Sequence, residues 1–62
     1  MKRGDRVRVK RGSMKGSFGT IRNIWGRNLA YSFESYATVK IDGIEGMVDF
    51  KEEVLEIVKK NE

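Results

Sequence analysis

The chain has 62 residues, a net charge of +4, no cysteine and no histidine. This length allows one domain with a thin core, and the composition excludes disulfides, thiolate metal sites and the commonest catalytic base and nucleophile. No segment approaches the roughly 20 apolar residues that cross a membrane, and residues 1–5 do not lead into a signal peptide. We therefore expect a single soluble, cytoplasmic domain over residues 1–62, without a cofactor, a metal or membrane contact.

Strict alternation of apolar and charged residues predicts the first strand, over residues 6–10. Val7 and Val9 point toward the core in this pattern, and every outward position carries a cation. The outward residues are Arg6, Arg8 and Lys10.

A second strand is predicted over residues 19–25, and its alternation slips near Asn23, which indicates a β-bulge. The connection before it, residues 11–17, is basic and contains glycines that let the backbone turn tightly. Arg11 and Lys15 of this loop can contact phosphate groups. The alternative is a solvated turn without a ligand.

The third strand is predicted over residues 36–41, after a ten-residue loop over residues 26–35. Four of the six aromatic residues lie in or beside this loop, namely Trp25, Tyr31, Phe33 and Tyr36. Beside Arg22 and Arg27, such rings can stack on bases while the cations hold phosphates. In the alternative interpretations, Phe33 and Trp25 cover the end of a barrel, or the loop forms a homodimer.

Asp42-Gly43 is the strongest hairpin signal in the chain. A two-residue turn there pairs Ile41 with Ile44 and sets the register of the fourth strand. Lys40 then faces Glu45, a pair worth about 0.2–1 kcal/mol. In this register the core face carries Ala37, Val39, Ile41, Ile44 and Val48, and Phe50 continues it.

Residues 51–54 are predicted to form one helical turn, capped by Asp49, before a fifth strand over residues 55–58. In that strand Leu55 and Ile57 point inward. The competing interpretation is a helix over residues 51–60, because the apolar residues there also have helical spacing. The polar residues 59–62 are expected to fray.

The basic residues are concentrated in the first half of the chain. Residues 1–28 hold nine cations against Asp5 alone, whereas residues 29–62 hold four lysines against eight acids. This asymmetry indicates a polyanionic partner, unless the two halves pair within the fold, for example through Glu56 beside the first strand. The clustered acids Glu52 and Glu53 are interpreted as solvated turn residues rather than as a catalytic pair.

The glycines and apolar residues of the first two strands resemble a KOW motif over residues 4–25. The matching residues are Val7, Val9, Gly12, Lys15, Gly16, Gly19 and Ile21. KOW motifs occur in certain ribosomal proteins and transcription-elongation factors, where a tight loop between two barrel strands often touches RNA or protein. The resemblance implies an SH3-like barrel.

Two further resemblances imply other functions. Residues 4–8, 48–51 and 55–57 resemble the type II dihydrofolate reductases, which are SH3-like tetramers with a Val-Gln-Ile-Tyr segment in the active pore. Here Asp49 stands at the glutamine position and Lys51 at the tyrosine position. The chain also resembles basic SH3-like accessory subunits of photosynthetic complexes, which dock proteins. The Ala-Leu-Tyr-Asp-Tyr run of proline-binding SH3 domains is absent.

We therefore predict an all-β, five-stranded SH3-like barrel with one short helical turn before the last strand. It is expected to bind nucleic acid electrostatically and not to be an enzyme. The predicted contact residues are Arg6, Arg8, Lys10, Arg11, Lys15, Arg22, Trp25, Arg27 and Tyr31. One alternative is protein docking or self-assembly through Trp25, Tyr31, Phe33 and Tyr36. The other is a tetramer like the type II reductases.

Overall fold

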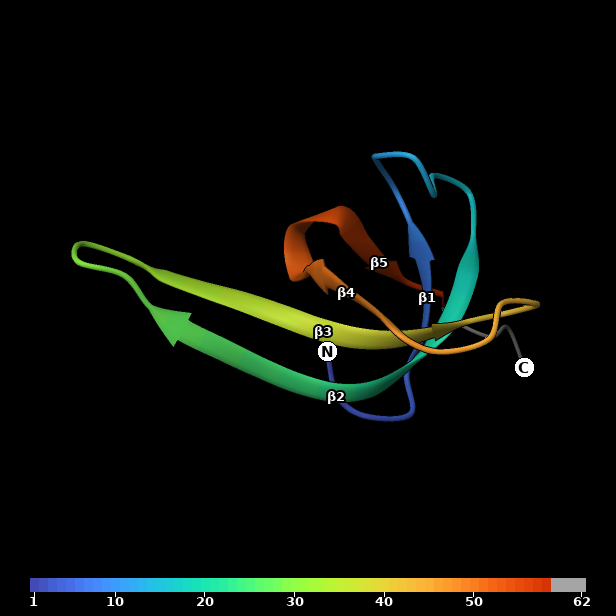
Figure 1. Ribbon diagram of the computed structural model, residues 1–62, viewed down its shortest axis with the longest axis horizontal. Helices are drawn as coiled ribbons and strands as arrows, with labels where there is room; N and C mark the ends of the chain where they lie inside the picture. Colours follow the sequence, from blue (N-terminus) through green and yellow to red (C-terminus); the bar gives the residue numbers. More distant parts are fainter. Residues whose placement is uncertain (59–62) are drawn as a thin grey trace.

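Five antiparallel strands form one strongly curved sheet in the computed structural model, which describes residues 1–58 (Figure 1). The strand order is β4-β3-β2-β1-β5. The elements are β1 (Arg6–Val9), β2 (Phe18–Asn28), β3 (Phe33–Ile41), β4 (Val48–Lys51), the 3-10 turn η1 (Glu52–Val54) and β5 (Leu55–Ile57). The predicted architecture, all-β with five strands and one helical turn before the last, is confirmed. The predicted fraying of residues 59–62 lies outside the described residues.

The core lies on one face of this sheet and is built from alternate residues of β1, β2, β3 and β5. Val7 and Val9 are buried, as the alternation of the first strand predicts. The buried apolar side chains are Val7, Val9, Ile21, Ala37, Val39, Ile41 and Leu55. Because so few side chains are fully buried, each one carries a large share of the stability.

The predicted bulge in β2 is confirmed by a register shift between Ile21 and Asn23. Ile21 faces Val39 and Asn23 faces Thr38, so Arg22 is the extra residue. A bulge bends its strand and re-aims the side chain at that point. Here it separates the buried half of β2 from a half that extends past the core.

The predicted ten-residue loop is wrong, because β2 and β3 continue through most of it. Their pairing runs out to Asn28 and Phe33, and the Leu29 amide donates to the Ser32 carbonyl at 2.7 Å to close the turn. We call residues 25–36 the arm, which projects far beyond the core in Figure 1. No core lies beneath the arm, so its sequence lacks the apolar alternation that predicts a strand.

The predicted register of the β3–β4 hairpin is also wrong, by two residues. Val39 faces Val48 rather than Gly46, and six residues, 42–47, connect the strands. A shift of two keeps the same face, so Val48 still packs against the core, whereas Ile44 is 42% exposed. The Lys40 amine donates to the carbonyls of Ile41 and Ile44 instead of pairing with Glu45.

The C-terminal part is a 3-10 turn followed by a strand, so the competing helix is wrong over the described residues 51–57. Asp49 does not cap this turn; it lies within β4, and no side chain caps η1. Leu55 is buried, but Ile57 is 44% exposed. Both face the core side through their pairing with Val9 and Val7, and Ile57 remains open because β5 is an edge strand.

Candidate nucleic-acid interface

Both outward cations of β1, Arg6 and Arg8, are paired with acids of the fold. Arg6 donates to both carboxylate oxygens of Asp42, at 3.0 and 2.6 Å, and Arg8 lies 2.5 Å from Glu56. The hydrogen bond from Arg6 lowers the pKa of the Asp42 carboxyl below its usual value, so this pair stays ionised at neutral pH. The interpretation that the two halves of the chain pair with each other therefore holds for Arg6 and Arg8.

The first loop keeps exposed cations at one end of β1. Lys10 and Lys15 form no ion pair within residues 1–58, and Arg11 donates to the Glu53 carbonyl at 3.1 Å. Gly12 and Gly16 have φ of 93° and 90°, conformations that glycine adopts without strain. The loop therefore turns on its glycines. Lys10 follows the end of β1 rather than belonging to it.

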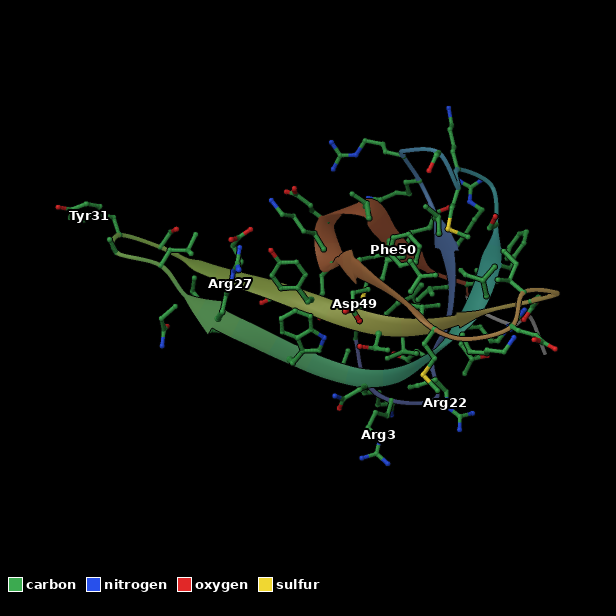
Figure 2. The ribbon with its side chains drawn as sticks, in the orientation of Figure 1. Arg3, Arg22, Arg27, Tyr31, Asp49 and Phe50 are labelled. Atoms are coloured by element: carbon green, nitrogen blue, oxygen red, sulfur yellow. The ribbon has the colours of Figure 1, made fainter. Side chains whose placement is uncertain are left out.

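A second basic group lies at the other end of β1, where the N-terminal segment meets the bulge. The Gly4 amide donates to the Ile21 carbonyl at 2.8 Å, which brings Arg3 beside Arg22. Both arginines border a surface hollow of about 310 Å³, and their side chains extend on the same side of the molecule (Figure 2). Neither forms an ion pair with the described residues. Sequence analysis missed Arg3, because only a contact between distant segments places it here.

Trp25 and Tyr36 form a cross-strand stack on the face of the arm opposite the core. Their ring centroids are 4.5 Å apart and their planes differ by 9°. The indole nitrogen of Trp25 donates to the Thr38 hydroxyl at 3.1 Å, which in turn donates to Asp49 at 2.6 Å. The predicted loop aromatics are therefore partners within a sheet, and the Trp25 ring is held in place from two directions.

Arg27 shares the carboxylate of Glu34 with Lys51 on the same face of the arm. Glu34 lies 3.4 Å from Arg27 and 3.0 Å from Lys51, and it accepts a hydrogen bond from the Tyr36 hydroxyl at 3.0 Å. The Lys51 and Tyr36 hydrogen bonds lower the pKa of the Glu34 carboxyl. The guanidinium carbon of Arg27 also lies 5.8 Å from the centre of the Tyr36 ring. Arg27 therefore orders the arm more than it offers a free charge.

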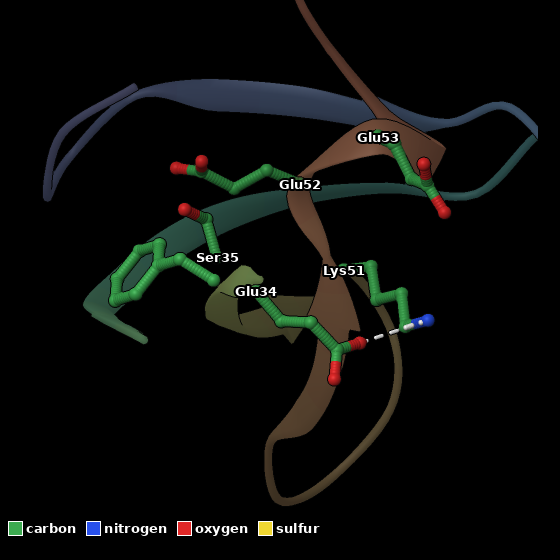
Figure 3. Close-up of a pocket in the computed structure, with 6 residues that line it drawn as sticks. Glu34, Ser35, Lys51, Glu52 and Glu53 are labelled. Carbon is green, nitrogen blue, oxygen red and sulfur yellow. Dashed lines mark ion pairs between the residues drawn. The ribbon is translucent and has the colours of Figure 1, made fainter. Parts of the chain in front are cut away.

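An acidic hollow of about 330 Å³ separates the arm from η1 (Figure 3). Its lining residues are Phe33, Glu34, Ser35, Lys51, Glu52 and Glu53. Lys51 points toward Glu34 and is paired with it. With Glu34, Glu52 and Glu53 against Lys51, the lining of this hollow is net negative and repels a polyanion.

The tip of the arm exposes apolar side chains. Tyr31 is fully exposed and lies far from Arg3 and Arg22 in Figure 2, and Phe33 is 61% exposed. The Phe33 ring packs over Gly26, where a Cβ would meet it at 2.3 Å. Phe33 therefore covers a glycine of the arm, and the interpretation that it covers the barrel end is wrong.

No protein-family model matches the chain, and a search of curated proteins finds no similar sequence. Within residues 1–58 no cluster of three or more acidic, histidine or cysteine side chains is placed to hold a metal ion. The only helical element of that part, η1, is far too short to cross a membrane.

Proposed function

We propose that the protein binds nucleic acid through Arg3, Arg22 and Trp25, which we call the Arg22 face. The observation that carries this proposal is the pairing of charges. Arg6 and Arg8 are each paired with an acid and Arg27 shares Glu34 with Lys51, whereas Arg3 and Arg22 converge without an acid among the described residues. Arginine forks bind phosphate oxygens with two parallel hydrogen bonds, so two adjacent arginines suit a phosphate backbone.

The Arg22 face differs from the surface that the sequence predicts. β1 contributes less to this surface than the sequence predicts, because Arg6 and Arg8 are already paired with acids. Lys10 and Lys15 form a separate basic group at the other end of β1, which also attracts a polyanion. Binding of this kind depends on salt and reads little sequence, because it rests on phosphate contacts.

Removing both arginines of the Arg22 face is expected to weaken binding and to reduce its salt dependence. Each lost phosphate contact lowers the slope of log affinity against log salt by about 0.7–0.9. The measurement is a titration of Arg3→Ala/Arg22→Ala with a short labelled oligonucleotide at two salt concentrations. We expect a clear loss of affinity at low salt and a slope shallower by about 1.4–1.8.

The matched control is Lys10→Ala/Lys15→Ala, which removes the same net charge from the other basic group. It is expected to retain most of the affinity. Equal losses in the two double variants would mean that net charge alone drives binding. Undetectable binding of the unaltered protein at low salt would exclude a nucleic-acid-binding function.

Self-association through the arm tip is the second candidate function, favoured by the exposure of Tyr31, Phe33 and Leu29 together at one end of the molecule. Light scattering of the unaltered protein is then expected to give a dimer, and Tyr31→Ala a monomer. Met47→Ala is the control, because Met47 is 56% exposed but lies in the 42–47 connection. A monomer in all three samples would contradict self-association.

A further inference from the structure

The Trp25 ring has one covered face and one open face. Tyr36 stacks on it from β3, with the two planes nearly parallel. On the other side of β2, β1 pairs with residues 18–20, and the described backbone hydrogen bonds to the N-terminal segment end at Ile21. The second face of the indole is therefore turned toward an open sheet edge, and Trp25 is 37% exposed.

This open ring is held rigidly, which is unusual for an exposed aromatic side chain. Its nitrogen is fixed by Thr38, and Thr38 is fixed by Asp49 of the next strand. Tyr36 prevents rotation from one side and is itself bonded to Glu34. A ligand that stacks on Trp25 therefore meets a ring whose side-chain entropy is already lost, which favours binding.

A cation lies on the same strand as Trp25, a few residues before it. Arg22 precedes Trp25 by three residues, which is about 10 Å along a strand. The bulge turns Arg22 outward, and Arg3 lies beside it at the same hollow. A base on the open face of Trp25 can thus be followed by a phosphate near Arg22.

We propose that Trp25 is a stacking platform for one unpaired base, so that the protein selects single-stranded nucleic acid over duplex. This inference rests on the function proposed above. Bases in a duplex are stacked on one another and present only their edges in the grooves. A ring fixed on the face of a sheet reaches the flat side of a base only when that base is unpaired.

The chain offers its own reporter for this contact, because Trp25 is its only tryptophan. The experiment titrates the protein with oligothymidylate and with a duplex of the same length, at one low salt concentration, and follows indole fluorescence. Oligothymidylate is expected to quench the fluorescence and to bind at least fivefold more tightly than the duplex.

Variants of Trp25 distinguish the loss of the aromatic ring from a general effect on the fold. Trp25→Leu is expected to lower affinity for the single strand about fivefold to a hundredfold, the range of base–aromatic stacking, and to leave duplex affinity unchanged. Trp25→Phe keeps an aromatic face and is expected to recover most of the loss. Phe18→Leu, which removes an exposed aromatic ring at the other end of β2, is the control and should bind like the unaltered protein.

The outcomes distinguish the two proposals. If neither the single strand nor the duplex binds at low salt, the proposed function itself fails. If both bind equally, without quenching and without a change in Trp25→Leu, nucleic-acid binding stands and the stacking platform is overturned. A preference for duplex also overturns it.

Discussion

Ile21→Ala is expected to remove about 2–5 kcal/mol from the free energy of unfolding. Ile21 is fully buried at the point where β2 crosses the centre of the core, facing Val39. The free energy of unfolding of a 62-residue domain is only about 3–9 kcal/mol, at roughly 0.05–0.15 kcal/mol per residue. The cavity left by the missing atoms therefore consumes most of the stability, and a large fraction of the variant is expected to be unfolded at 25 °C.

Ile44→Ala makes the same chemical change outside the core and is the matched control. In the register that the Asp42-Gly43 signal predicts, Ile44 would be a core residue, but it is 42% exposed in the 42–47 connection. Its replacement is expected to cost less than about 1 kcal/mol. Urea unfolding of both variants measures the difference. Similar losses at the two positions would contradict the observed register and support the predicted one.

Prediction from the sequence works best for strands that pack one face against the core. The alternation of β1 and the slip at Asn23 are local consequences of one buried face, and both are confirmed by Val7, Val9 and the register shift beyond Ile21. The short turn before the last strand follows from local acids and spacing in the same way.

The wrong predictions concern parts of the fold that are stabilised by contacts between residues distant in the sequence. The β3–β4 register departs from the turn signal because Asp42 is engaged by Arg6 of β1 and Lys40 binds carbonyls within the connection. The arm escapes prediction because cross-strand pairs, above all Trp25 with Tyr36, sustain it without burial. Neither kind of contact produces a periodic pattern of apolar residues in the sequence.

The candidate site shows the same division. Residue type alone identifies Arg22 and Trp25 as candidates, because an arginine and a tryptophan near a strand end suit nucleic acid. Residue type alone does not decide whether Arg6 and Arg8 are paired with acids. The expected position of the last strand beside the first makes Glu56 a candidate partner, whereas Asp42, 36 positions from Arg6, is found only in the structure. Arg3 joins the site only through the hydrogen bond between Gly4 and Ile21.

Gly19→Ala is expected to destabilise the protein by about 1–3 kcal/mol through overpacking. A Cβ at this position would lie 2.6 Å from Cγ1 of Val39 and 2.7 Å from the carbonyl oxygen of Lys40. Alanine normally gains roughly 0.5–1 kcal/mol over glycine inside a strand. The clash outweighs this gain, because the Lys40 oxygen belongs to the β3 backbone and cannot rotate away.

Gly26→Ala tests whether backbone crowding is the cause. Gly26 lies in the same strand, and its closest neighbour is the Phe33 ring at 2.3 Å, a side chain that is 61% exposed and can swing aside. Its thermal midpoint is expected to change little, whereas Gly19→Ala should lower the midpoint by about 4–8 °C for each kcal/mol lost. Equal midpoints for the two variants would contradict this account. These glycines then have different roles: Gly12 and Gly16 turn the loop, and Gly19 lets β2 and β3 approach each other.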